Sequence, residues 1–97
     1  MNVEYSKRSL DDIREMAARS KREFGDAVSA KLDEHLHSII DQIARDPKSR
    51  TPLRNRAGVH VAVFVLYPYK LFYRIVDDST VRILHVRHTS RRSWGGE

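Results

Sequence analysis

Basic residues in the second half of the chain are the residues whose types could carry out chemistry. Residues 1–50 contain ten Lys/Arg and ten Asp/Glu, whereas residues 51–97 contain eight Lys/Arg and three Asp/Glu. The formal net charge of +5 therefore arises entirely in the second half. Clustered cationic side chains can bind a polyanion or an acidic protein, and they can stabilise negative charge that develops on a phosphate.

Metal-free cleavage of RNA is one reaction that such residues could support. Attack of a 2′-hydroxyl on its own phosphate needs a proton acceptor, a proton donor and cations that stabilise the pentavalent oxyanion. Arginine stays protonated and is a poor base, so proton transfer would fall to His60, His85 or His88. His88, at the end of the last predicted strand, is the best placed of these, and its other interpretation is a structural histidine in a hydrogen-bond network. The cationic candidates are Arg54, Arg56, Lys70, Arg74 and Arg87.

Metal ions and cofactors are not expected. Hard cations need clustered carboxylates, and the second half offers only Asp77 and Asp78 in a predicted turn and Glu97 at the terminus. Asp33 and His37 are four residues apart on a predicted helix, but two ligands do not make a site, and a solvated helix surface is the favoured interpretation. The chain has no cysteine, which excludes disulfides and thiolate metal sites.

Two helices are predicted in the first half. Ser9 and Asp12 have the spacing of a capping box, which predicts a short helix over about residues 8–19. Ser20 and Glu23 repeat the signal and predict the start of a longer helix, which Pro47 stops. Two neighbouring amphipathic helices joined by a short break indicate a helical hairpin. The apolar stripe of the longer helix consists of Phe24, Val28, Leu32, Leu36, Ile39, Ile40 and Ile43.

Strand patterns flank this hairpin. A short strand is predicted over Asn2–Ser6, and three strands follow the polar loop Lys48–Ala57. The three later strands are Val59–Leu66, Lys70–Val76 and Val81–His88, with connections short enough for an antiparallel meander. The order β-α-α-β-β-β predicts one α+β domain over residues 1–97, in which the helical hairpin packs on a small, mainly antiparallel sheet and the first strand lies at an edge.

The turn Asp77–Thr80 sets the expected register of the last two strands. A tight turn would place Val76 opposite Val81, Arg74 opposite Ile83, Phe72 opposite His85 and Lys70 opposite Arg87. One face would then carry the mixed set Lys70, Phe72, Arg74, His85 and Arg87, a candidate functional face. The opposite face of the sheet would lie under the helices and carry Leu71, Tyr73, Ile75, Leu84 and Val86. Arg82 and His88 would lie at the two ends of that face. The alternative for the basic residues is a solvated sheet face with edge-protecting charge.

The expected location is the cytoplasm, without membrane contact. No apolar run approaches the roughly 20 residues that a membrane-spanning helix needs. The first residues lack the apolar core of a signal peptide.

Several sequence segments together carry a resemblance to a known family. They are the loop Pro52-Leu53-Arg54, the strand Tyr69–Ile75 and the last strand with its tail, Ile83–Arg92, within the β-α-α-β-β-β order. In combination they resemble the RelE/ParE toxins of bacterial type II toxin–antitoxin modules, and the similarity covers essentially the whole chain. The resemblance implies a small basic toxin that is neutralised by a cognate antitoxin, with which it forms a hetero-oligomer.

The resemblance implies different activities for the two branches of this family. RelE-like members are ribosome-dependent endoribonucleases, in which case the catalytic residues here would be Lys70, Arg74, Arg87 and His88. ParE-like members inhibit DNA gyrase. Thr89 follows His88 and no tyrosine occurs after Tyr73, so the ending favours a ParE-like gyrase inhibitor, with the ribosome-dependent mRNA nuclease as the alternative.

Three sets of binding residues are expected. We expect an acidic or strand-forming antitoxin segment to contact Val65, Phe72 and Arg74. The tail residue Trp94 would pack on the core or at a partner interface. The residues expected to bind the target or nucleic acid are Arg54, Arg56, Arg91 and Arg92. A free-standing nucleic-acid-binding domain is a third interpretation, which the modest net charge makes less favoured.

Overall fold

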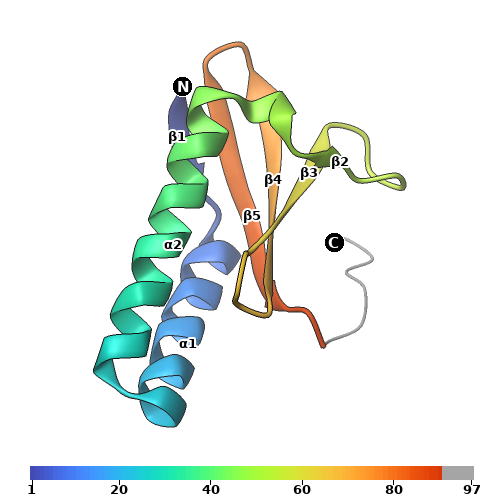
Figure 1. The fold of residues 1–97 in the computed structure, drawn as a ribbon. Helices are drawn as coiled ribbons and strands as arrows, with labels where there is room; N and C mark the ends of the chain where they lie inside the picture. Colours follow the sequence, from blue (N-terminus) through green and yellow to red (C-terminus); the bar gives the residue numbers. More distant parts are fainter. Residues whose placement is uncertain (91–97) are drawn as a thin grey trace.

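Two helices cover one face of a five-stranded mixed sheet in the computed structural model, which describes residues 1–90 (Figure 1). The strand order is β1-β5-β4-β3-β2, with β1 parallel to β5 and the other neighbours antiparallel. The α+β class and the helical hairpin on a mainly antiparallel sheet are thereby confirmed. The elements are β1 (Asn2–Tyr5), α1 (Lys7–Phe24), α2 (Asp26–Arg45), the 3-10 turn η1 (Pro47–Ser49), β2 (Thr51–Pro52), β3 (Val59–Val63), β4 (Tyr69–Asp77) and β5 (Thr80–His88).

The boundary between the two helices differs from the prediction. Ser6, not Ser9, caps α1, because its Oγ accepts from the Ser9 N–H at 3.0 Å. Ser9 is fully buried inside the helix, and Ser20, predicted to start the second helix, is buried within α1. The break falls at Gly25, whose φ of 88° is available to glycine at little cost. Ser9 and Ser20 have the spacing of helix caps relative to the acidic residues that follow them, but both serines are buried inside α1.

The core lies between the helical hairpin and the sheet. Leu36 and Ile43 of α2 are almost completely buried, as are Leu71 and Tyr73 of β4. The Tyr73 hydroxyl donates to the Pro47 carbonyl at 2.5 Å and so ties β4 to the end of α2. Burial is the main cause that raises the pKa of Tyr73 to about 12, so the hydroxyl keeps its proton as a donor.

The register of β4 against β5 is confirmed at one end and wrong at the other. Lys70 pairs with Arg87 and Phe72 with His85, as predicted. A bulge then shifts the pairing, because β5 uses one more residue than β4 between Phe72 and Tyr73. Beyond the bulge the pairs are Tyr73 with Ile83, Arg74 with Arg82, Ile75 with Val81 and Asp77 with Thr80.

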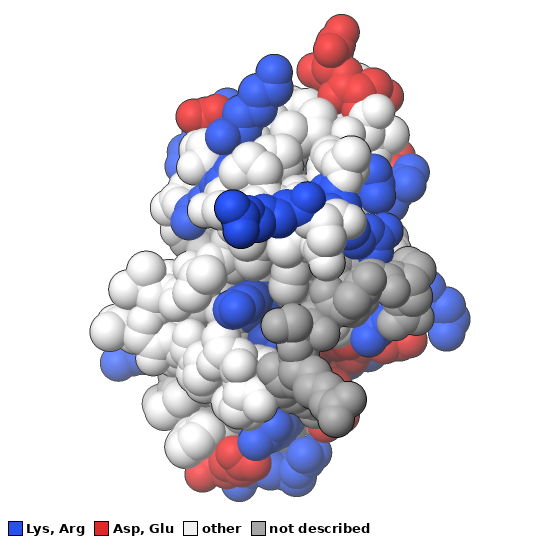
Figure 2. All heavy atoms as spheres, turned by 90° about the vertical axis from the view of Figure 1, so that its right-hand side faces the viewer, with Lys and Arg blue, Asp and Glu red and all other residues white. Residues whose placement is uncertain are grey.

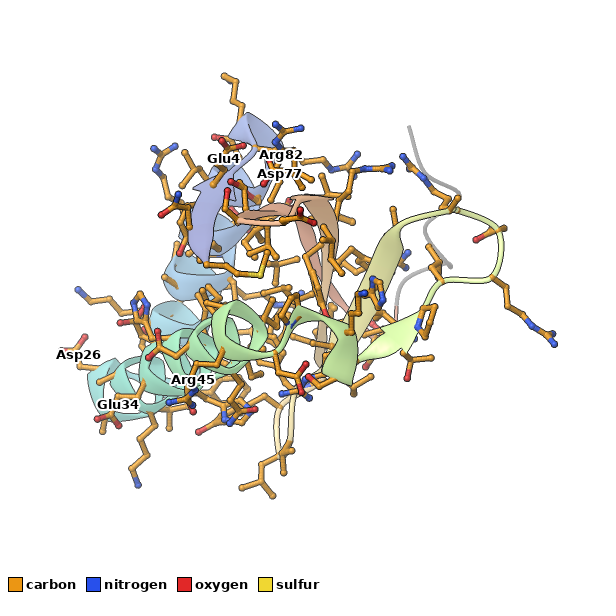
Figure 3. All side chains as sticks on the ribbon, turned by 90° about the horizontal axis from the view of Figure 1, so that it is seen from above. Glu4, Asp26, Glu34, Arg45, Asp77 and Arg82 are labelled. Carbon is orange, nitrogen blue, oxygen red and sulfur yellow. The ribbon has the colours of Figure 1, made fainter. Side chains whose placement is uncertain are left out.

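The bulge exchanges residues between the two faces of β5. Ile83 is fully buried in the core, whereas the prediction placed it opposite Arg74 on the other face. Arg82 lies beside Arg74, whereas the prediction put it on the helix-covered face. Arg82 donates from Nε and Nη2 to Glu4 Oε1 at 3.1 and 2.9 Å, so it also links β5 to β1 (Figure 3).

The polar loop and the third predicted strand also differ in detail. Residues 48–57 contain η1 and the short edge strand β2, whose Pro52 pairs with His60, an edge position at which proline is tolerated. Strand β3 ends at Val63 rather than Leu66, and the chain turns at Leu66 with a φ of 72°. None of the helices within residues 1–90 has the length and apolar character needed to cross a membrane.

Candidate partner-binding surfaces

A groove of about 540 Å³ lies on the face of the sheet opposite the helices. We call it the sheet-face groove. Its walls come from β2 and the β2–β3 loop on one side and from β4 and β5 on the other. The described residues that line it are Thr51, Pro52, Leu53, Arg54, Asn55, Val61, Lys70, Phe72, Arg87 and Thr89.

The sheet-face groove is basic with an apolar floor. Lys70 and Arg87 are cross-strand partners, and Phe72 follows two residues along β4 with 5% of its surface exposed. Arg87 is 8% exposed, so its charge is largely removed from water. Arg54 adds an exposed cation from the β2–β3 loop. Lys and Arg side chains run across this side of the molecule, with Asp and Glu towards its margins (Figure 2).

The predicted catalytic set is divided by the fold. Lys70 and Arg87 meet in the sheet-face groove. Arg74 lies further along the same face, where its Nη1 donates to the Ala57 carbonyl at 3.1 Å. His88 lies on the helix side, where it packs edge-on against Tyr69 at 5.3 Å between ring centroids, and its Nδ1 accepts from the Ser90 N–H at 3.1 Å. The side chains of Arg87 and His88 point to opposite faces because they are consecutive in a strand.

A buried carboxylate–histidine pair was not predicted. Asp12 of α1 contacts His85 of β5, with 2.5 Å between Oδ2 and Nδ1, and the same oxygen accepts the Val86 N–H at 3.0 Å. A carboxylate can only accept, so the His85 Nδ1 carries the proton. The His85 ring stacks on Phe72 at 5.9 Å between centroids. The sequence showed Asp12 only as a helix-cap residue, because a contact across 73 positions leaves no local signal.

The free energy of unfolding should fall in mild acid, where the His85 ring becomes doubly protonated and positively charged. Burial is the main cause that lowers the pKa of His85, opposed by its hydrogen bond to the Asp12 carboxylate and by the charge of that group, while Arg8 and Arg87 lower the pKa further. The unfolded chain, with an ordinary histidine pKa of about 6.5, therefore binds more protons in mild acid than the folded chain. We expect the free energy of unfolding, measured in urea, to decrease as the pH is lowered below about 6.5.

The matched variants for this test are His85→Phe and His37→Gln. The His85→Phe chain keeps an aromatic ring on Phe72 but should lose most of the pH dependence in this interval. The exposed His37, whose Nε2 lies 3.5 Å from Asp33 on the same helix face, should be replaceable without changing it. An unchanged pH profile in His85→Phe would contradict the assignment.

The sheet-face groove can supply electrostatic stabilisation to an anionic group. Its described lining includes three cations but no histidine, carboxylate or tyrosine that could transfer a proton. Within residues 1–90, no group of three or more His, Asp or Glu side chains could hold a metal ion. The groove can therefore bind and orient an acidic or anionic partner.

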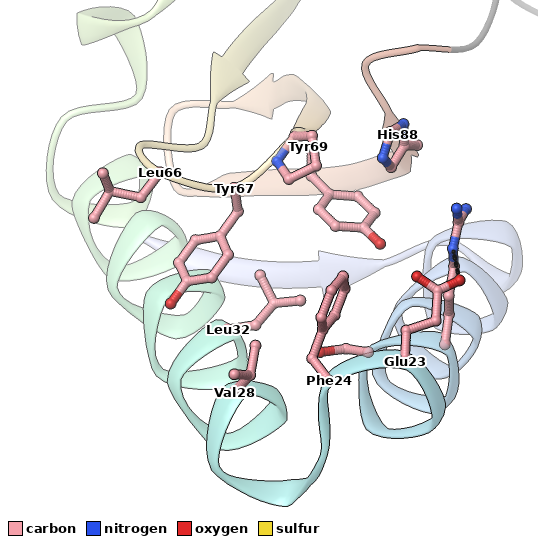
Figure 4. Close-up of a pocket in the computed structure, with 11 residues that line it drawn as sticks. Glu23, Phe24, Val28, Leu32, Leu66, Tyr67, Tyr69 and His88 are labelled. Atoms are coloured by element: carbon pink, nitrogen blue, oxygen red, sulfur yellow. Dashed lines mark hydrogen bonds and ion pairs between the residues drawn. The ribbon is translucent and has the colours of Figure 1, made fainter.

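A second, smaller groove of about 250 Å³ lies where the helical hairpin approaches the β3–β4 loop (Figure 4). We call it the tip groove. Phe24 and Val28 border it from the hairpin, and Leu66 and Tyr67 border it from the loop. Phe24 was predicted as part of the buried stripe of the second helix, but it ends α1 and is 65% exposed. The other lining residues are Arg19, Ser20, Glu23, Leu32, Pro68, Tyr69 and His88.

The remaining predicted binding residues fall in three places. Arg56 lies in the β2–β3 loop near Arg54, partly exposed. Val65 lies in the β3–β4 loop beside the tip groove and is 64% exposed, whereas Phe72, with which it was grouped, is buried and lines the sheet-face groove. Arg91, Arg92 and Trp94 lie outside the residues that the structure describes.

The fold is shared with solved structures of bacterial toxin–antitoxin systems. The chromosomal ParDE system from P. aeruginosa matches with a TM-score of 0.76 and 12% identity, over 91% of this chain and 95% of that chain. The E. coli RelBE complex matches with a TM-score of 0.65 and 17% identity, over 93% and 98%. The RelBE2 complex from Mycobacterium tuberculosis matches with a TM-score of 0.60 and 27% identity, over 90% and 95%. A helical hairpin on a five-stranded sheet is thus the fold that this chain shares with the toxins of these systems.

The family itself is defined by sequence. Residues 3–93 match the family model described as the ParE toxin of the type II toxin–antitoxin system, parDE, and the chain belongs to this family. It is therefore the toxin of a type II toxin–antitoxin system. A comparison with curated protein sequences returned no match.

Proposed function

We propose that this toxin is a ParE-like inhibitor of DNA gyrase that acts by binding as a protein and is neutralised by a cognate antitoxin. The family model supports this branch, and so does the likeness of the fold to the ParDE system. A gyrase target also implies that the chain acts in the cytoplasm.

One observation carries the choice between a binding toxin and a nuclease. General acid–base cleavage of RNA needs groups that can accept and donate a proton within hydrogen-bond reach of the substrate. The described lining of the sheet-face groove offers Arg54, Lys70 and Arg87 for charge but no histidine, carboxylate or tyrosine. His88, the predicted proton-transfer residue, lies on the other side of the sheet, beside Tyr69. This arrangement favours binding over catalysis.

The sheet-face groove suits the antitoxin. Its three cations attract carboxylates, while the Phe72 floor suits an apolar side chain between them. An antitoxin segment with acidic residues on either side of an apolar one would fit this combination, in an extended or a helical form. We propose contacts to Phe72 and to the neighbouring Arg74, with Val65 reached only by a segment that continues around the β3–β4 loop.

A second set of cations is assigned to the target. We propose that Arg56 of the β2–β3 loop, together with Arg91 and Arg92 of the tail, contacts the target. Arg54 could serve both partners because it lies at the rim of the groove and is exposed.

The proposed function is tested with purified toxin, gyrase and relaxed plasmid. We expect the toxin to block supercoiling at a stoichiometric ratio and to trap cleaved DNA, and we expect added antitoxin to reverse both effects. Supercoiling that continues at full rate with toxin in excess would rule out gyrase as the target.

Ribosome-dependent mRNA cleavage is the second candidate. It is favoured by the juxtaposition of Lys70 and Arg87, behind which Asp12 orients the His85 ring. On programmed ribosomes this function predicts cleavage at codon positions that is lost in Arg87→Ala and in His88→Ala. Uncut mRNA would eliminate this function, and cleavage that neither substitution reduces would eliminate Arg87 and His88 as its catalytic residues.

A further inference from the structure

Several apolar side chains at and beside the tip groove are exposed to water and are not part of the hydrophobic core. Leu66 is 93% exposed, Phe24 is 65% exposed and Val65 is 64% exposed. Single exposed apolar residues are common, but Phe24 and Leu66 border the same groove, and Val65 lines the neighbouring hollow together with Leu66. Ligand pockets usually occupy about 300–1,000 Å³, so a groove of about 250 Å³ suits one or two apolar side chains better than a whole small molecule.

Leu66 is also held in an unfavourable backbone conformation. Its φ of 72° lies in the left-handed region, where the Cβ of a residue other than glycine comes too close to the backbone. A glycine or asparagine would adopt it more readily. Leu66 therefore combines backbone strain with an apolar side chain in water, and strain of this kind persists mainly where a functional contact compensates for it.

The loop that carries Leu66 is fixed on both sides. The Val65 N–H donates to His35 Nε2 at 3.0 Å, and the His35 ring packs against Phe64 and Tyr67 at 5.4 Å between centroids. On the sheet side, the Pro68 carbonyl accepts the Thr89 N–H at 2.8 Å. A loop anchored in this way presents its side chains in a defined geometry, which reduces the entropy lost on binding.

Charge distinguishes the occupant of the tip groove from that of the sheet-face groove. Charged side chains near the hairpin tip pair with one another: Arg19 with Glu23 at 3.1 Å, Lys21 with Asp26 at 3.6 Å and Arg22 with Glu15 at 3.9 Å. Paired charges leave little net attraction for a phosphate backbone or an acidic peptide. The tip groove therefore complements an uncharged apolar segment, whereas the sheet-face groove complements an acidic one.

We propose that the tip groove is the docking site for the toxin's protein target, which inserts one or two apolar side chains from an uncharged segment between Phe24 and Leu66. This docking site rests on the proposed function, in which the toxin acts by binding a target protein. The main site for the target is then separate from the sheet-face groove, the main site for the antitoxin, and Leu66 and Phe24 are the anchors that contribute most to target binding.

The test compares Leu66→Gly and Phe24→Ser with the control Val76→Ser. Val76 is 39% exposed at the far end of β4 and lines neither groove. We expect both tip variants to need at least about tenfold more toxin for half-maximal gyrase inhibition, the effect of losing one anchor. Antitoxin affinity should stay within about twofold of the wild type, because the tip variants leave the sheet-face groove unchanged. Leu66→Gly should melt at the same temperature as the wild type or higher, since glycine relieves the strain.

The failure of this proposal differs from the failure of the proposed function. If wild-type toxin does not inhibit gyrase, the gyrase assignment fails, and growth arrest on induced expression replaces gyrase inhibition as the readout for the same variants. If both tip variants were as potent as the wild type in gyrase inhibition, or in growth arrest where that assay replaces it, the proposed docking site would be wrong. Antitoxin affinity that falls in parallel would assign the tip groove to the antitoxin, and a wild-type dimer that Leu66→Gly dissociates would assign it to a second copy. Either result would also overturn the proposal.

Discussion

Reversing two charges of the sheet-face groove, in Arg54→Glu with Lys70→Glu, is expected to weaken the complex with the cognate antitoxin by about 100-fold. Both side chains line the groove and neither is fully buried, so the fold should tolerate the change. Like charges brought together at an interface cost several kcal/mol, and about 2.7 kcal/mol corresponds to 100-fold in affinity. Isothermal titration of purified toxin with antitoxin measures the effect.

The control for this prediction is the double reversal Lys7→Glu with Arg45→Glu. It changes the net charge by the same amount, but at the start of α1 and the end of α2. An antitoxin guided by overall charge alone would respond equally to both double variants, and that result would contradict a specific role for the groove. A salt titration adds a second check, because the loss of affinity in the groove variant should diminish as the ionic strength rises.

Replacing Asp12 with alanine is expected to lower the free energy of unfolding by about 3 kcal/mol. The substitution leaves the Val86 N–H and the His85 Nδ1–H without the acceptor they share. A buried donor without a partner costs about 1–3 kcal/mol, and hydrogen bonds to a charged group lie at the upper end of the range. Total stabilities of small domains are about 5–15 kcal/mol, so the loss should be plain in urea unfolding as a lower midpoint with an unchanged slope.

Asp11→Ala is the matched control for Asp12→Ala. Asp11 is the neighbouring carboxylate on α1, but its side chain is 54% exposed and pairs with Lys7 and Arg14 on the helix surface. Surface pairs of this kind contribute about 0–1 kcal/mol. If both variants unfold at the same urea concentration, the Asp12 contacts do not hold α1 against β5 in the way described.

The predicted effect of Asp12 reflects how the exposed edge of β5 is covered. Strand β1 pairs with β5 from Thr80 to Ile83, and within residues 1–90 no strand borders the later part of β5 on that side. There Ser6 Oγ donates to the Leu84 carbonyl at 2.9 Å, and Asp12 accepts from Val86. The first turns of α1 thereby satisfy backbone groups that would otherwise be open to pairing with another chain.

Local patterns in the sequence were sufficient for the parts of the fold that depend on neighbours. The hairpin of β4 and β5 places Lys70 beside Arg87 and Phe72 beside His85, as predicted from a short turn and a period of two. The apolar stripe of α2 from Leu32 to Ile43 is buried as predicted. These features depend on spacing within a segment, which sequence shows directly.

Features that depend on burial were mispredicted for an identifiable reason. Ser9 and Ser20 have the residue types of helix caps, but they lie in α1 where the helix faces the rest of the fold, and Gly25 breaks the hairpin instead. The bulge beside Phe72 exchanges Ile83 and Arg82 between the two faces of β5. A single inserted residue reverses every later side chain in a strand, and no local propensity marks where packing will place it.

The sequence by itself determined the class of this protein: a small α+β toxin with a helical hairpin, a basic meander and no cluster of carboxylates in its basic half. Only the tertiary structure decided which of its charged and apolar residues meet. It joined Asp12 to His85, moved Ile83 into the core and Arg82 beside Arg74, and placed Phe24 and Leu66 around the tip groove. The physical reason is that composition and periodicity act within a segment, whereas contacts between distant segments arise from packing of the whole chain.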